Sequence, residues 1–238
     1  MEQVEKPRWG LFEIVAVFIG IMGAGMLFAR YSDAVKSWLT ASGIGDITLA
    51  FFTVAYVFQF IVTILLVLLF TIVVNQARLS DLGVKHVGSR AYIRYGLMGG
   101  GLLLIFIVAL GMIINLLHPN IQPQLFEEML RTISSPGGFI VLLIMGAVLA
   151  PISEELYYRG MIYPVFRGYV GPFWGAIIAG ILFGLVHWDL WRAIPLAAGG
   201  VILCYIYEKS GSILVSALAH GVWNGIMALI VYFSLVSI

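Results

Sequence analysis

Long apolar runs make up most of this chain, and short polar connections separate them. The hydrocarbon core of a bilayer needs about 20 apolar residues to be crossed by a helix. By that measure the pattern predicts seven spans, at residues 9–29, 47–74, 95–117, 138–167, 172–190, 195–208 and 212–237. We therefore expect an all-α, polytopic transmembrane helix bundle of about seven helices. An eighth helix is the alternative, because the fifth and sixth segments are short.

The composition agrees with a membrane protein. Hydrophobic residues make up 61% of the chain and charged residues 11%, whereas a soluble domain is about half apolar and a quarter charged. The apolar runs are too long and alternate too little for outer-membrane strands. A net charge of +1 gives no electrostatic reason to expect a nucleic-acid partner. We expect one integral membrane domain over residues 1–238, surrounded by lipid.

Basic residues are distributed unequally between the two ends of the predicted bundle. Eight of them fall at the N-terminus and in the even-numbered connections, and four fall in the opposite connections. Loops rich in Lys and Arg stay in the cytoplasm. The N-terminus and the 75–94 connection are therefore predicted to be cytoplasmic, and the short chain is typical of a bacterial or archaeal plasma membrane. The eight are Lys6, Arg8, Arg78, Lys85, Arg90, Arg94, Arg167 and Lys209; the four are Arg30, Lys36, Arg131 and Arg192.

The fourth predicted span contains two adjacent carboxylates, Glu154 and Glu155, and one guanidinium, Arg159. Charges inside a bilayer are costly and persist mainly where they have a partner or a function. Glu155 and Arg159 are four residues apart and share a helical face, which favours an ion pair. Glu154 points about 100° away. This division suits Glu155 to a structural role and Glu154 to a general base, although a purely structural ion pair between helices is the alternative.

The fifth predicted span contains Phe183 and His187, which are one helical turn apart. Glu154 lies sixteen residues before position 170, in the predicted turn, and His187 lies seventeen after it. In an antiparallel hairpin the two residues fall at equal depth. A histidine near a helix end is more often an interfacial anchor, but the matched depth favours a catalytic role. Phe183 could then form a wall of the site or fix the imidazole ring.

The last predicted span contains His220 and Asn224, again four residues apart on one helical face. An imidazole N–H and a carboxamide N–H could together stabilise the oxyanion of a tetrahedral intermediate. An interhelical hydrogen-bonded pair is the structural alternative. With Glu154 and His187 nearby to activate a water molecule, the inventory suits hydrolysis.

The set Glu-Glu-x-x-x-Arg, Phe-x-x-x-His and His-x-x-x-Asn, in this order and in consecutive hydrophobic segments, resembles the CPBP family. This family comprises CAAX prenyl endopeptidases and bacteriocin-processing proteins and is also called the Abi family. The resemblance covers roughly residues 138–231, the expected catalytic core in the C-terminal half. It implies an intramembrane endopeptidase in which Glu154 and His187 activate water, His220 and Asn224 stabilise the oxyanion, and Glu155 and Arg159 support the site. Residues 1–137 would form N-terminal helices that select the substrate.

Three questions stay open at this point. Glu154, His187 and His220 could hold zinc with an open position for water, but we favour hydrolysis without a metal. The substrate could be a peptide or a lipidated protein, such as a prenylated CAAX-type chain or a peptide leader. The alternative function is a non-catalytic membrane immunity or scaffold protein. We also expect the site to open toward the turns near residues 170 and 210, on the predicted cytoplasmic side.

Overall fold

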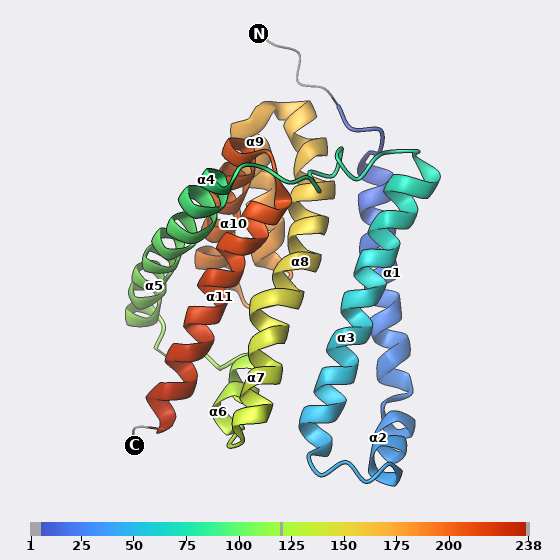
Figure 1. Cartoon of the computed structure of the whole chain (residues 1–238), viewed down its shortest axis with the longest axis vertical. Helices are drawn as coiled ribbons and strands as arrows, with labels where there is room; N and C mark the ends of the chain where they lie inside the picture. The colour runs from blue at the N-terminus through green and yellow to red at the C-terminus, as the bar shows by residue number, and fades with distance from the viewer. Residues whose placement is uncertain (1–5, 120, 237–238) are drawn as a thin grey trace.

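The computed structural model describes residues 6–119 and 121–236, and within them the chain is helical with no strand. Residue 237, the predicted end of the last span, lies outside this range. Two long helices at one side are connected to the rest of the bundle by the 75–88 segment (Figure 1). The helical elements are α1 (Leu11–Arg30), α2 (Ser32–Ala41), α3 (Ile47–Leu68), η1 (Leu69–Val74), α4 (Ser89–Ala91), η2 (Tyr92–Met98), α5 (Gly99–Leu117), α6 (Leu125–Thr132), α7 (Pro136–Ile144), η3 (Met145–Leu149), α8 (Ala150–Glu155), η4 (Leu156–Ile162), α9 (Tyr163–Leu185), α10 (Leu190–Ser210) and α11 (Ile213–Val236).

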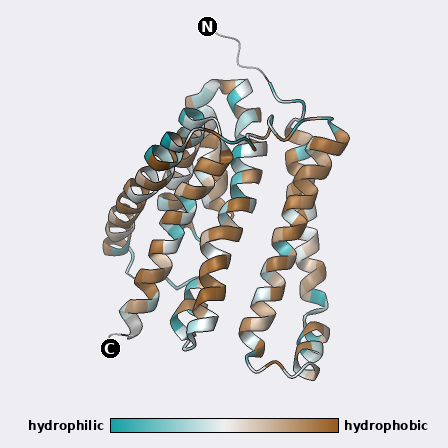
Figure 2. Ribbon diagram, viewed as in Figure 1, coloured by the Kyte–Doolittle hydropathy of each residue, from teal (hydrophilic) through white to brown (hydrophobic). Residues whose placement is uncertain are grey.

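Six continuous helical stretches of the described residues are long and apolar enough to cross a membrane. One of them, Pro136–Leu185, has 50 residues and is broken at Gly171, where φ is 82° and ψ is 169°. Only glycine adopts this conformation readily, so the chain reverses direction there. Counting its two arms separately gives seven passes, and the predicted all-α polytopic bundle is confirmed. Hydrophobic residues cover most of each long helix, and hydrophilic residues concentrate in the connections (Figure 2).

The second arm of α9 packs against α10 through small residues. A Cβ atom on Gly180 would lie 2.6 Å from the carbonyl oxygen of Ala197, and one on Gly200 would lie 2.8 Å from the Cα of Gly180. Such small residues allow helix backbones to approach closely in lipid. This packing fixes the position of α10, and therefore of the groups that α10 presents to its neighbours.

The helix containing the two carboxylates is not a regular α-helix. The short α8 lies between two π-helical stretches, η3 and η4. Pro151 near the start of α8 cannot donate a backbone hydrogen bond to the preceding turn, and that turn is the widened η3. Single π-helical turns inside α-helices occur frequently at functional sites. Around Pro151 the helix is therefore widened rather than ended.

Candidate active site

Glu154 and Glu155 face different surroundings, as their 100° separation on a helix requires. The side chain of Glu155 has no exposed surface, whereas 33% of the Glu154 side chain is exposed. Glu155 Oε1 accepts a hydrogen bond from Arg159 Nη1 at 2.8 Å, and Arg159 is equally buried. The predicted ion pair is confirmed. Arg159 Nη2 also donates to the carbonyl oxygen of Gly200 at 2.9 Å, which connects η4 to α10.

Glu155 has a second partner that the sequence does not reveal. Its Oε1 atom lies 2.9 Å from His220 Nδ1 on α11. The carboxylate beside Arg159 is an acceptor, so His220 Nδ1 carries the hydrogen of this bond. Glu155 therefore fixes both the orientation and the tautomer of His220, and it connects α8 to α11. The supporting role expected for Glu155 would act through its two hydrogen bonds, to Arg159 and to His220.

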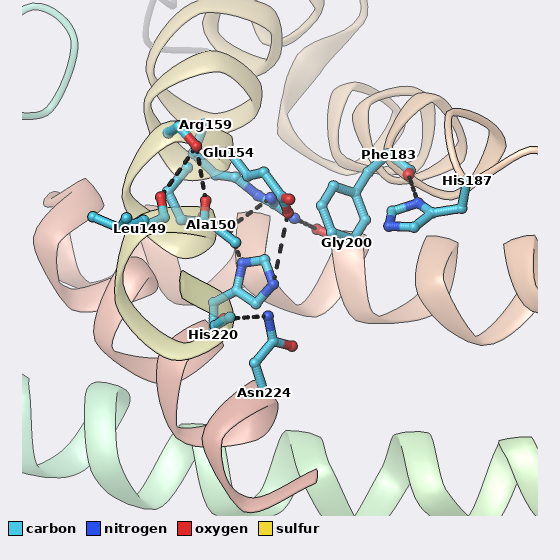
Figure 3. Close-up of polar contacts among 12 residues, drawn as sticks. Leu149, Ala150, Glu154, Arg159, Phe183, His187, Gly200, His220 and Asn224 are labelled. Atoms are coloured by element: carbon cyan, nitrogen blue, oxygen red, sulfur yellow. Dashed lines mark hydrogen bonds and ion pairs between the residues drawn. The ribbon is translucent and has the colours of Figure 1, made fainter. Parts of the chain in front are cut away.

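His220 is buried against an aromatic side chain. The indole of Trp223 stacks against the imidazole with a centroid separation of 5.3 Å, and only 2% of His220 is exposed. Its Nε2 atom lies 3.8 Å from Glu154 Oε2 (Figure 3). Because Nδ1 holds a hydrogen, Nε2 of the neutral ring is an acceptor and becomes a donor only when the ring is protonated.

His187 follows the second arm of α9 and is also fixed at Nδ1, which donates to the carbonyl oxygen of Phe183 at 3.0 Å. Its Nε2 atom is therefore an acceptor in the neutral ring. The Phe183 ring is in edge contact with His187 at 5.4 Å and with His220 at 5.7 Å between centroids. Figure 3 shows the phenyl ring beside the His187 imidazole. Phe183 thus does both things expected of it: its ring forms a wall, and its carbonyl fixes the imidazole.

Asn224 lies one turn beyond His220 on α11. Its Nδ2 atom donates to the carbonyl oxygen of Gly146 at 3.0 Å, and a carboxamide nitrogen has a second hydrogen to donate. Tyr56 of α3 donates to the neighbouring carbonyl of Met145 at 3.3 Å. Both carbonyls belong to η3. The π-helical stretch therefore holds the carboxamide in place and leaves it one donor.

All four predicted catalytic side chains line one cavity of about 410 Å³, namely Glu154, His187, His220 and Asn224. Glu154 and His187 also line an adjoining cavity of about 330 Å³ that reaches side chains of α1 and α3. Among the described residues no hydrogen bond joins Glu154 to His187, but the shared cavities have ample room for water. The structure thus brings the predicted set together.

Glu154, His187 and His220 do not form a zinc site in this geometry. Catalytic zinc is usually bound by three protein ligands within about 2.0–2.2 Å. Within the described part of the chain, no three His, Cys, Asp or Glu side chains are close enough to hold an ion in common. The Phe183 ring contacts both imidazoles, and His220 Nδ1 is bonded to Glu155. We therefore derive no step through a metal ion.

Sequence reasoning missed the polar residues at one end of the cavity. Gln124 and Glu127, beside and within α6, line the same cavity as the catalytic candidates. Gln124 Nε2 donates to the carbonyl oxygen of His187 at 3.5 Å. Arg192 donates to Glu127 Oε2 at 3.2 Å and to the carbonyl oxygen of Gln122 at 2.7 Å. The acidic first turn of α6 was the available signal, but nothing in the sequence places α6 against the site.

The cavity has α6 beside it. We expected the cavity to open toward the turns near residues 170 and 210, and this direction stays a prediction. α6 and the turn after His187 belong to the connections on the other side of the bundle (Figure 1). The second arm of α9 is short and ends at Leu185, so the segments that follow it lie against the cavity.

The fold and the cavity define a polytopic helical membrane protein with carboxylate, imidazole and carboxamide groups gathered inside the bundle. Residues 136–226 match the family described as type II CAAX prenyl endopeptidase Rce1-like. The resemblance inferred from the three motifs is therefore confirmed, and this part of the chain is similar to that family.

Curated relatives match parts of the chain. The "UPF0177 protein YaiF" of Lactococcus lactis subsp. lactis (strain IL1403) is 29% identical over 48% of this chain and 49% of its own length. The "Putative membrane peptidase YdiL" of Bacillus subtilis (strain 168) is 27% identical over 35% of this chain and 34% of its own. The chain thus spans between one third and one half of these relatives. No solved structure matches it significantly.

Proposed function

We propose that this protein is an intramembrane endopeptidase that hydrolyses a peptide bond of a membrane-associated substrate. The observation that carries the proposal is the single cavity lined by Glu154, His187, His220 and Asn224. A carboxylate and an imidazole acceptor face the space where a water molecule would be activated, and two polar groups of α11 face the same space. The match of residues 136–226 to a peptidase family supports the same reaction.

In the proposed reaction Glu154 takes a proton from water while His187 Nε2 accepts the other hydrogen of that water. The hydroxide oxygen bonds to the carbonyl carbon of the substrate, and the carbonyl oxygen becomes an oxyanion. Asn224 donates its second N–H to the oxyanion. Glu154 then returns the proton to the leaving nitrogen, the C–N bond breaks, and an amine and a carboxylic acid leave. No metal is needed for this sequence.

The proposed role of His220 depends on whether its ring is protonated. Its Nδ1–H bond to Glu155 leaves Nε2 without a hydrogen unless the ring is protonated. Stabilisation of the oxyanion by His220 therefore requires an imidazolium. The Glu155 carboxylate, 2.9 Å from Nδ1, is the negative charge beside that imidazolium.

The N-terminal helices contribute to substrate selection in this proposal. Phe18 and Met22 of α1 and Gln59 and Phe60 of α3 line the cavity of about 330 Å³ that also contains Glu154. An apolar cavity with a few polar groups suits an apolar peptide or a lipidated chain. The substrate class is accordingly a hydrophobic peptide or a lipidated protein.

Replacement of Glu154 by Gln tests the proposal. Purified protein would be assayed with an apolar peptide and with its prenylated form, in detergent. Loss of a general base typically lowers the rate about 10²–10⁴-fold. The matched control is Glu128→Gln, which alters an exposed carboxylate of α6. Normal turnover by folded Glu154→Gln protein would exclude the role, and absence of cleavage by the wild-type protein would favour a binding or scaffold function.

A further inference from the structure

A separate cavity of about 510 Å³ shares no lining residue with the two cavities of the catalytic candidates. Arg8 Nη1 donates to the carbonyl oxygen of Gln76, and Ile213 N donates to the carbonyl oxygen of Gly83. These bonds hold the N-terminal segment and the α10–α11 turn against the 75–88 connection, which crosses this end of the bundle (Figure 1). We call this space the basic cavity. Its charged lining residues are Lys6, Arg8, Asp81, Lys85, Arg167 and Glu208.

The basic cavity has an excess of positive charge. Four cations and two carboxylates line it, which leaves a net charge of +2. Glu208 forms an ion pair with Arg167 and accepts a hydrogen bond from the Tyr163 hydroxyl at 2.8 Å. Asp81 Oδ2 accepts a hydrogen bond from the backbone nitrogen of Arg78 at 2.8 Å. Both carboxylates therefore have partners of their own, and the excess charge belongs to the remaining cations.

Those cations are Lys6, Arg8 and Lys85, and none of them takes part in an ion pair with another described residue. Arg8 uses one nitrogen on a backbone carbonyl and keeps further N–H groups to donate. Lys85 Nζ lies over the α10–α11 turn, 3.5 Å from the place that a Cβ on Gly211 would take. Like charges gathered around one polar space repel one another, so this arrangement favours an anion between them.

Aromatic side chains place the basic cavity at the depth of lipid headgroups. Tyr169 and Trp174 lie on either side of the reversal at Gly171, and they are 60% and 59% exposed. Exposed Tyr and Trp side chains concentrate at the interface between membrane and water. Lys6 Nζ lies 4.7 Å from the centre of the Tyr169 ring, and Arg167, two residues before Tyr169, lines the cavity. The cations therefore lie level with the interfacial aromatic residues.

We propose that the basic cavity binds the phosphate group of an anionic phospholipid. Lys and Arg side chains bind phosphate through charge-assisted hydrogen bonds, and basic pockets between transmembrane helices bind anionic headgroups. A volume of about 510 Å³ is within the range of small-ligand sites. The bound phosphate connects the N-terminal segment, through Arg8, to the 75–88 connection, through Lys85. This site depends neither on the proposed peptidase function nor on which side of the membrane this end faces.

Native mass spectrometry of the purified protein in a neutral detergent tests the proposal, with phosphatidylglycerol as the anionic probe and phosphatidylcholine as the neutral one. The wild-type protein should bind one phosphatidylglycerol more tightly than phosphatidylcholine. Lys85→Gln should weaken the binding of phosphatidylglycerol about fivefold, and Lys6→Gln combined with Lys85→Gln about 25-fold, as expected for one and two lysines beside an anionic lipid. The matched control is Lys209→Gln, an exposed lysine of α10 that does not line the cavity, and it should bind as the wild type does.

Thermal unfolding in the same detergent keeps the test independent of misfolding. Without anionic lipid, the double variant should unfold at the wild-type temperature, because both lysines are exposed. Phosphatidylglycerol should then raise the Tm of the wild type more than that of the double variant, since a ligand of the folded state stabilises it. Equal affinity of the wild type and the folded double variant for phosphatidylglycerol overturns the proposal, and so does equal binding of the two lipids by the wild type. Inorganic phosphate at the concentration of the lipid should not displace it; displacement overturns the choice of a lipid as the source of the phosphate.

Discussion

The buried pair between Glu155 and Arg159 gives the sharpest prediction about stability. Replacing Arg159 by Met keeps the length and apolar bulk of the side chain but leaves the buried Glu155 without its guanidinium partner. The wild-type bond is 2.8 Å long, and both side chains are 0% exposed. Breaking one partner of a buried pair costs about 3–5 kcal/mol, because the remaining charge is uncompensated. For a chain of this size that cost corresponds to a fall in Tm of roughly 6–20 °C.

The chain contains a reporter for this measurement. Cys204 is the sole cysteine and is fully buried, so a thiol-reactive fluorogenic dye in detergent reports the temperature at which the bundle opens. The matched control is Arg131→Met. Arg131 pairs with Glu127 at the same four-residue spacing and the same 2.8 Å, but its side chain is 48% exposed. Exposed pairs contribute about 0–1 kcal/mol, so this control should shift Tm little.

A double substitution separates charge from packing. Arg159→Met combined with Glu155→Gln removes both charges, and the loss of the uncompensated carboxylate should restore part of the stability. Activity should not return, because His220 loses the carboxylate at Nδ1. If Arg159→Met unfolds at the same temperature as the wild type, the assignment of this pair to stability is refuted.

Three further outcomes are expected. Asn224→Ala should lower kcat about 10²–10³-fold with KM nearly unchanged, measured by steady-state kinetics on the peptide, as for loss of an oxyanion donor; a raised KM with normal kcat would instead mean that Asn224 binds substrate. A chelator such as 1,10-phenanthroline should leave the rate unchanged, and inhibition reversed by zinc would contradict the metal-independent reaction. Gly171→Ala should lower the free energy of unfolding by about 1–3 kcal/mol, measured by thermal unfolding, because φ is 82° there. The control Gly137→Ala should lower it far less, because no neighbouring atom lies within 4 Å of the added Cβ.

Local spacing was sufficient to predict much of the site. The four-residue separations of Glu155 from Arg159 and of Phe183 from His187 put each pair on one helical face, and the structure contains both contacts. Hairpin counting placed Glu154 and His187 at one depth, and both line the same cavity. These inferences succeed because helical geometry is fixed by the backbone and because charges in lipid need partners.

Contacts between distant segments were beyond the reach of the sequence. The bond from His220 to Glu155 spans 65 positions along the chain, and the bond from Asn224 ends on a backbone carbonyl of a π-helical stretch. Neither follows from periodicity, since π-helical turns have no simple sequence signal. The position of α6 beside the cavity was not predictable either. Residue counts fix depth along a helix, but they do not show which loop folds back over the cavity.

The adjacent carboxylates connect stability with catalysis. A single carboxylate could not both stay ionised in a buried pair and exchange protons with water. Two neighbours on a helix divide these tasks, because Glu155 turns toward Arg159 and Glu154 toward the cavity. Yet Glu155 also holds Nδ1 of His220, whose other nitrogen lies 3.8 Å from Glu154. A change at Glu155 should therefore alter the proton positions in the cavity without touching the substrate, and its effect on turnover should exceed what its effect on folding explains.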